Sequence, residues 1–120
     1  RDLVECDAPL LAGSDWPAAV ASMDPWPAIQ AMVTRRDPLN KTPGALWPEQ
    51  AISLGQALKI FTLDGARAQR RDATSGSIEI GKSADLIVLD RDLFASPVEN
   101  IKTTQVMMTL FEGRVVYQRT

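Results

Sequence analysis

A short apolar run opens the first half of the chain. Residues 8–13 are almost entirely apolar, and the run ends at Gly13, before Ser14 and Asp15. A run of this length bounded by turn-forming residues is typical of a buried strand. The pattern therefore puts Asp15 at the carboxyl end of a predicted strand.

A helix is predicted after the pair Asp24-Pro25, which has the composition of an N-cap followed by the first helical position. Apolar residues then recur at helical spacing up to Arg35-Arg36, a suitable cationic helix end. Residues 37–48 contain three prolines and a glycine, which predicts a loop. Because this loop carries Leu46 and Trp47, we expect it to fold over a neighbouring part of the protein.

A second helical segment begins at Ser53, which forms the capping-box spacing with Gln56. An apolar stripe follows at helical spacing and continues to Phe61. Thr62 is predicted to cap a further short helix that ends near Arg70. Each helix is apolar on one side only, so we expect both to cover a sheet.

The pattern changes to alternation near residue 72. Ser77–Ile80 alternates, Asp85–Asp90 has the pattern of a buried strand between charges, and Val106–Phe111 pairs with Arg114–Tyr117 as a predicted hairpin. The chain thus divides into residues 1–72, which suit the end of a parallel α/β domain, and residues 73–120, which suit an antiparallel sheet.

The composition is that of an ordinary soluble domain. The 120 residues are 45% hydrophobic and 23% charged, and 13 basic against 15 acidic side chains give a formal charge of -2. No apolar run approaches the roughly 20 residues that span a bilayer, and no signal-peptide pattern opens the chain. The acidic balance disfavours nucleic-acid binding. We expect a cytoplasmic protein without membrane or nucleic-acid partners, with its one cysteine, Cys6, buried as a small hydrophobe.

The chain contains no histidine. By itself it therefore holds no Ser-His-Asp or Cys-His nucleophile, no histidine-rich zinc site and no imidazole general base.

One segment, Gly76–Ser83, satisfies the spacing of a phosphate-binding P-loop. That loop needs a preceding strand and a following helix, whose amides meet the phosphates. Here Lys82-Ser83 leads directly into a predicted strand, and Glu79 would repel phosphate. We therefore interpret the segment as a strand edge that turns at Gly81.

Asp15 is the strongest candidate for chemistry, and its residue pattern leaves two interpretations open. An Asp between a strand and Trp-Pro is well suited to a turn or cap. Alternatively, catalytic groups gather at the carboxyl ends of α/β-barrel strands, where a carboxylate can bind a metal or move a proton.

Several segments together resemble the C-terminal third of the metal-dependent amidohydrolase superfamily, and most closely family 3, which includes deformylases of N-substituted formamides. The resemblance runs through nearly the whole chain in unbroken order. It is carried by Gly13–Pro17, Asp24-Pro25 with Arg35, Ser53–Thr62, Gly76–Asp90 and Thr109–Tyr117.

The resemblance implies an α/β fold: the C-terminal fragment of a (β/α)8 TIM barrel plus the C-terminal strands of a small β-sandwich. Residues 8–13 would be the eighth barrel strand, and Gly76–Tyr117 the share of the sandwich. It also implies that Asp15 binds a divalent metal, zinc by expectation, or lies beside it. There Asp15 would take a proton from the attacking water and pass it to the leaving nitrogen.

The family's histidine ligands have no counterpart here, and a complete barrel has typically about 250 residues. We therefore expect a fragment of a hydrolase of non-peptide carbon–nitrogen bonds in amides or formamides, inactive alone and binding no metal alone. The opening Arg1 in place of Met fits such a fragment. The alternative is a non-catalytic assembly or scaffold domain derived from the same fold.

Three further residues are candidates for the substrate side of the site, with a small molecule as the expected substrate. Trp16 and Trp47 could contact an apolar substrate, and Arg35 could meet an anion, although packing and helix-end roles explain them equally well. The missing barrel strands would leave sheet edges exposed, so we also expect a homo-oligomer.

Overall fold

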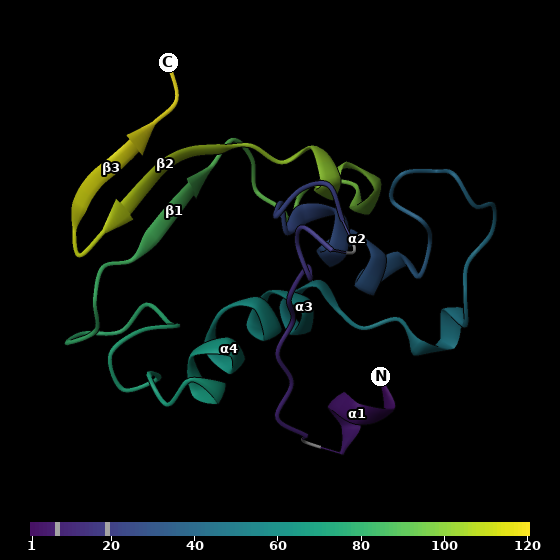
Figure 1. The fold of residues 1–120 in the computed structure, drawn as a ribbon, viewed down its shortest axis with the longest axis horizontal. Coiled ribbons are helices and arrows are strands. Elements are labelled where there is room, and N and C mark those ends of the chain that lie inside the picture. Colours follow the sequence, from purple (N-terminus) through teal and green to yellow (C-terminus); the bar gives the residue numbers. More distant parts are fainter. Residues whose placement is uncertain (7, 19) are drawn as a thin grey trace.

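The computed structural model describes residues 1–6, 8–18 and 20–120. Helices dominate the first half of the described chain, and a small antiparallel sheet lies in the second half (Figure 1). In chain order the elements are α1 (Asp2–Glu5), α2 (Trp26–Thr34), η1 (Pro48–Gln50), α3 (Leu54–Phe61), α4 (Leu63–Ala68), β1 (Leu86–Leu89), η2 (Val98–Thr103), β2 (Val106–Phe111) and β3 (Arg114–Gln118), where η denotes a 3-10 helix.

Both predicted long helices are present. In α2 the N-cap is Pro25 rather than Asp24, but the Asp24 carboxylate still accepts a 3.0 Å bond from the Trp26 amide and so caps the first turn. In α3 the predicted capping box is confirmed: the Gln56 amide donates to the Ser53 hydroxyl, and the Ser53 amide donates to the Gln56 side chain.

The sheet has the order β1-β2-β3, with both pairs antiparallel. The predicted hairpin of β2 and β3 turns at Glu112-Gly113, where the Asp85 carboxylate accepts a 2.8 Å bond from the Glu112 amide. Asp85 thereby ties the turn to the start of β1.

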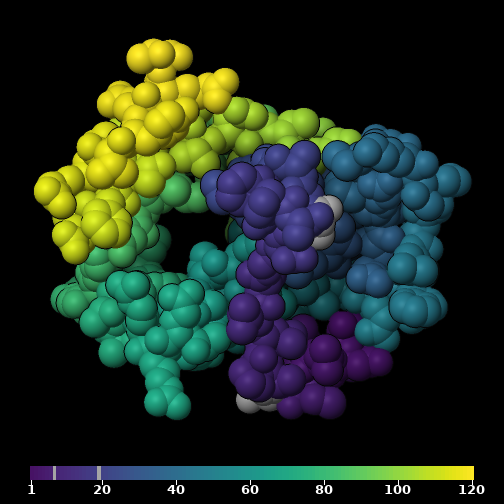
Figure 2. Space-filling view, viewed as in Figure 1, coloured from purple at the N-terminus to yellow at the C-terminus, as the bar shows by residue number. Residues whose placement is uncertain are grey.

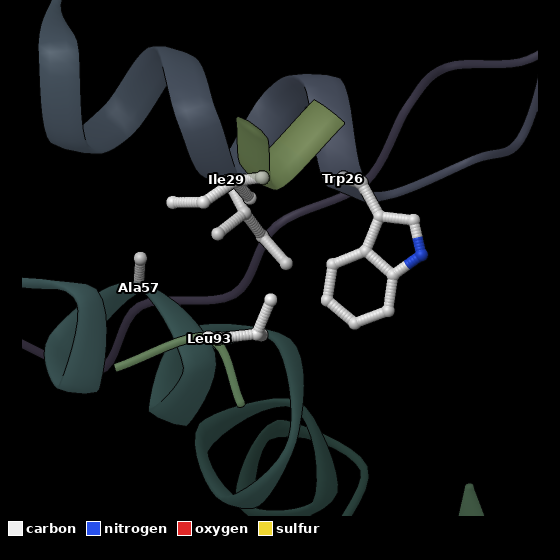
Figure 3. Packing of buried hydrophobic residues seen from close by; sticks show 5 residues of the cluster. Trp26, Ile29, Ala57 and Leu93 are labelled. Atoms are coloured by element: carbon white, nitrogen blue, oxygen red, sulfur yellow. The ribbon is translucent and has the colours of Figure 1, made fainter. Parts of the chain in front are cut away.

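The core draws on both halves of the chain. Trp26 and Ile29 from α2 pack with Ala57 from α3 and with Leu93 and Ile101 from the second half (Figure 3). Ile29 and Ile101 are the largest side chains that are fully buried. The division at residue 72 stays a prediction, but one hydrophobic cluster crosses it.

Hydrogen bonds join the same two halves. The side-chain oxygen of Gln30, a buried residue of α2, accepts a 2.9 Å bond from the Lys102 amide in η2. The Lys102 ammonium donates in turn to the Pro38 carbonyl at 2.7 Å. The helix α2, the loop after it and η2 are therefore held together by polar as well as apolar contacts.

The predicted strands at residues 8–13 and Ser77–Ile80 are wrong, since neither segment forms a strand in this structure. Leu11 is 65% exposed, and the side chains of Ile78 and Ile80 are almost fully exposed. The same reason explains both wrong predictions. A strand needs a hydrogen-bonding neighbour, and within the described residues neither segment pairs with a strand.

Three smaller expectations are also corrected. The Thr62 hydroxyl does not cap α4, because it donates backward to the Leu58 carbonyl. Leu46 and Trp47 are exposed, so the loop at 37–48 does not fold over a neighbour with these side chains. Cys6 is exposed rather than buried. Within the described ranges, no helix has the length and apolar character to cross a membrane.

Candidate functional site

Asp15 lies between α1 and α2, in a part of the described chain that forms neither helix nor strand. Its side chain is exposed, and its backbone has the left-handed conformation with φ 53°. The amide of Trp16 donates a 3.2 Å bond to the Ser14 hydroxyl, so this bond spans Asp15. The local sequence thus forms a tight turn that presents a carboxylate to solvent.

Left-handed backbone is shared by three of the predicted site residues: Asp15 with φ 53°, Arg35 with φ 56° and Trp47 with φ 46°. For Arg35 the helix end explains the conformation, because Arg35 is the C-cap of α2. A bulky residue such as Trp47 adopts this region rarely, and such strain is concentrated at functional sites. This makes Trp47 and Asp15 positions to test.

Arg35 has a clear structural role. Its carbonyl accepts a 2.8 Å bond from the Leu46 amide, and its Nε donates to the Leu46 carbonyl at 3.0 Å. These two bonds hold Arg35, just before the loop at 37–48, against Leu46 near the end of that loop. Within that loop the Asp37 carboxylate accepts bonds from three backbone amides, those of Leu39, Lys41 and Thr42. The loop is therefore fixed by its own polar groups.

Arg35 and Trp47 line one open depression of about 510 Å³, together with Arg1, Glu49 and Gln50. Asp15 and Trp16 are not among its lining residues. The structure thus brings Arg35 and Trp47 together but does not join them to Asp15. Trp16 is half exposed next to Asp15, whereas Trp26 is buried in the core.

The segment before Asp15 borders a cleft of about 440 Å³. Leu11 and Ala12 form one wall, and the end of α3 with α4 forms another. Figure 2 shows a hollow bounded by the purple N-terminal segment, the teal helices and the green start of the sheet, and the residues that line the cleft come from the first two of these regions. Neither acidic nor cysteine side chains line the described part of the cleft, whose wall mixes apolar residues with Thr62, Gln69, Arg71 and Ser75.

The P-loop-like segment does not form a phosphate cradle. Ser83 is followed by β1 rather than by a helix. The Lys82 ammonium donates to the Ser77 hydroxyl at 2.6 Å and to the Glu79 carboxylate at 2.9 Å, and Ser77 also donates to Glu79. These bonds lower the pKa of Glu79, with the Ser77 hydroxyl as the main cause. The lysine thus closes its own turn.

Among the acidic side chains of the described residues, Asp90 at the end of β1 has the pKa that departs most from its ordinary value. The Arg91 guanidinium donates to this carboxylate and, with the Gln105 amide, lowers the pKa of Asp90 to about 2. Arg91 also bonds the Thr103 carbonyl and hydroxyl. A shifted pKa can mark a reactive group, but here the ion pair with Arg91, whose guanidinium also bonds Thr103 in η2, explains the shift.

A divalent metal finds an incomplete set of ligands in this chain. Among the residues that the structure describes, no three His, Cys, Asp or Glu side chains converge. Asp15 fits as one ligand, because its carboxylate is exposed and carboxylate oxygens bind zinc and harder divalent ions. The remaining ligands would have to come from other polypeptide.

Ser14, whose hydroxyl closes the turn at Asp15, was not among the predicted site residues. The signal was present, since a serine two residues before an amide commonly closes a small turn with its hydroxyl. Because the same pattern occurs widely in loops, the residues alone did not distinguish this turn from others.

Comparison with known proteins places the chain in a family. The model of the amidohydrolase family matches residues 1–117. The chain belongs to the amidohydrolase family. The match confirms the resemblance to this family that the sequence shows. Enzymes of this family are typically metal-dependent.

Individual proteins also match across nearly the whole of this chain. It is 30% identical over 122 residues to the N-substituted formamide deformylase of Arthrobacter pascens, covering 100% of this chain and 21% of that protein. It is 32% identical over 117 residues to Protein LONG AFTER FAR-RED 3 of Arabidopsis thaliana, covering 98% and 19%. The chain therefore spans about a fifth of the length of these curated relatives.

A solved structure of an amidohydrolase from Thermotoga maritima MSB8 also matches, with a TM-score of 0.49 and 28% identity. The match covers 59% of this chain and 17% of that one. For this chain itself, the architecture is a mixed α/β arrangement with a three-stranded antiparallel sheet.

Proposed function

We propose that this chain is part of a metal-dependent amidohydrolase that cleaves non-peptide carbon–nitrogen bonds in amides, with N-substituted formamides as the first substrates to test. The family match over residues 1–117 carries the proposal. The similarity to a formamide deformylase along the whole chain supports the substrate class.

Asp15 is the group of this chain that acts on the substrate in this proposal. Its exposed carboxylate is short and acidic, and it follows the segment that the resemblance equates with the last barrel strand. As a general base, an Asp15 oxygen accepts a proton from the attacking water. As a general acid, it then delivers that proton to the leaving nitrogen, so that a formamide yields an amine and formate.

A divalent metal, zinc in our proposal, would supply Lewis acidity to the carbonyl oxygen and the water when it is bound. Asp15 would be one of its neighbours, and the histidine ligands would come from polypeptide outside these 120 residues. The chain alone has no histidine to offer. We propose a cytoplasmic location and a small-molecule substrate for the complete protein.

The test uses the protein encoded by the complete reading frame that contains this chain. Formate release from a panel of N-substituted formamides is measured before chelation, after chelation and after zinc is restored. We expect hydrolysis that is lost on chelation and regained with zinc. A protein that retains no divalent metal and hydrolyses none of the amides or formamides contradicts the proposal and favours a scaffold.

A further inference from the structure

The hydroxyl of Ser14 bridges the backbone on either side of Asp15. It accepts a 3.2 Å bond from the Trp16 amide, and Ser14 is itself half-buried. Asp15 sits inside this small turn with φ 53°.

The direction of a side chain depends on the backbone conformation of its residue. For a residue other than glycine, the left-handed region is the less stable choice and persists only when its surroundings hold it. Without the bond from the Trp16 amide to Ser14, Asp15 would lose a local restraint on φ. Its carboxylate would then point in a different direction for much of the time.

We propose that Ser14 is a positioning residue: its hydroxyl holds Asp15 in the left-handed conformation and thereby aims the carboxylate at the substrate. The inference rests on the proposed function, because it concerns the same carboxylate. It deepens that function by assigning to Ser14 a role in the rate of the chemical step, without contact between Ser14 and substrate.

The same loop provides a matched control. The Ser22 hydroxyl accepts a 3.1 Å bond from the Asp24 amide, which is the same kind of bond with the same separation of two residues. No reactive role is assigned to the residue that this second bond spans, Met23. Removal of the Ser22 hydroxyl therefore reports the cost of losing such a bond by itself.

The experiment compares four variants of the complete protein: Ser14→Ala, Ser14→Val, Ser14→Thr and Ser22→Ala. Misdirection of a reacting group can lower rates by up to about 100-fold, so we expect kcat of Ser14→Ala to fall by roughly 10- to 100-fold with KM unchanged. Ser14→Val should behave like Ser14→Ala. Ser14→Thr, which has the shape of valine but keeps the hydroxyl, should restore most of kcat.

Two measurements separate aiming from general damage. Bound metal per protein, determined by elemental analysis, should equal that of the parent in all four variants. A crystal structure of Ser14→Ala should show φ of Asp15 outside the left-handed region. Ser22→Ala should retain the parent's kcat.

Equal kcat values for Ser14→Ala and Ser22→Ala would overturn the inference, as would an unchanged φ of Asp15 in the variant. An effect on KM alone would also overturn it. Asp15→Asn is assayed alongside: if this variant keeps full activity, the proposed function of Asp15 fails. If it is inactive while Ser14→Ala is fully active, only the role of Ser14 fails.

Discussion

Asp15 and Asp90 show how two carboxylates of one chain differ in what holds them. Asp15 is exposed at a turn, with its backbone rather than its side chain restrained by a neighbour. Asp90 is bonded by Arg91 and by the Gln105 amide, which explains its low pKa. The Asp15 carboxylate is therefore accessible to a ligand, whereas the Asp90 carboxylate holds the end of β1 against the Gln105 backbone.

The low pKa of Asp90 predicts a dependence of stability on pH. Its pKa falls from an ordinary 3.8 to about 2 on folding, so the unfolded chain takes up the proton first as the pH drops. The stabilisation is therefore complete above the ordinary value and is lost as the pH falls towards 2. We expect Asp90→Asn to be less stable than the parent at neutral pH, with the difference shrinking across this range.

Urea unfolding at a series of pH values measures this effect. The exposed Glu99 of η2 serves as the control, in the variant Glu99→Gln. If Asp90→Asn and the parent differ by the same free energy of unfolding at neutral pH and near pH 2, Arg91 does not hold the carboxylate as described.

The order of residues along the chain allowed part of the candidate site to be predicted, whereas the rest depends on contacts in the folded chain. The position of Asp15 after an apolar run, and the family to which the chain belongs, could both be inferred from the sequence. That Arg35 would close a loop on Leu46 did not, because this bond joins residues 11 apart through an irregular segment. The separation of Trp47 from Asp15 also depends on tertiary structure.

At the level of elements, prediction succeeded where the signal was local. The capping box of Ser53 and Gln56 and the turn at Glu112-Gly113 each specify an element within a few residues. It failed at residues 8–13 and Ser77–Ile80, because a strand requires a partner that its own sequence does not contain. Apolar content alone did not make either segment a strand.

Gly76 lies in the loop between α4 and β1, where close packing against α4 makes it sensitive to substitution. It has φ +91°, and a Cβ at this position would lie 2.6 Å from the Ala66 Cβ in α4 and 3.1 Å from the Leu63 Cα. Gly81 has nearly the same φ, +92°, with no atom within 4 Å. Both Gly→Ala variants carry backbone strain, but only Gly76→Ala adds a steric clash.

We expect Gly76→Ala to lower the free energy of unfolding by about 1–3 kcal/mol more than Gly81→Ala does, the usual range for overpacking. Denaturant unfolding of the two variants measures the difference. Equal losses would mean that the loop at Gly76 does not rest against α4.

At the scale of the whole molecule, the two halves of the chain share one hydrophobic core, so we expect them to unfold together. Trp26, Ile29 and Ala57 belong to the first half, whereas Leu93 and Ile101 belong to the second. Composition placed a boundary near residue 72, but a change from helical to alternating pattern does not reveal which side chains pack together. Neither half buries this cluster by itself.

Truncation of Ile101 tests the shared core. Ile101→Ala should lower the free energy of unfolding by about 2–5 kcal/mol, since the side chain is fully buried, and should weaken helix and sheet signals together. Ile80→Ala is the control, because that side chain is fully exposed. Loss of sheet structure with α2 and α3 intact would contradict a single core.

The edges and faces of the sheet predict that the isolated chain associates with itself. Within the described residues, β1 and β3 each bond only to β2, which leaves two open edges. Large apolar side chains on the strands are also exposed, namely Ile87, Val88, Met107, Phe111, Val115, Val116 and Tyr117. Open edges and exposed apolar faces favour association between chains, so we propose a homo-oligomer.

Sedimentation over a range of concentrations should show self-association of the 120-residue chain. Val116→Lys should weaken it by placing a charge on β3, whereas Ala73→Lys, in an exposed turn, should not. A monomer at every concentration would contradict the expectation.

The most direct test concerns the carboxylate of Asp15. In the complete protein, kcat/KM for formamide hydrolysis is measured for Asp15→Asn and for Asp24→Asn, which alters an aspartate that caps α2 in the same region. Loss of acid–base catalysis should lower kcat/KM of Asp15→Asn by about 10²- to 10⁴-fold, with Asp24→Asn close to the parent. Full activity of Asp15→Asn on every substrate that the parent accepts would contradict the account.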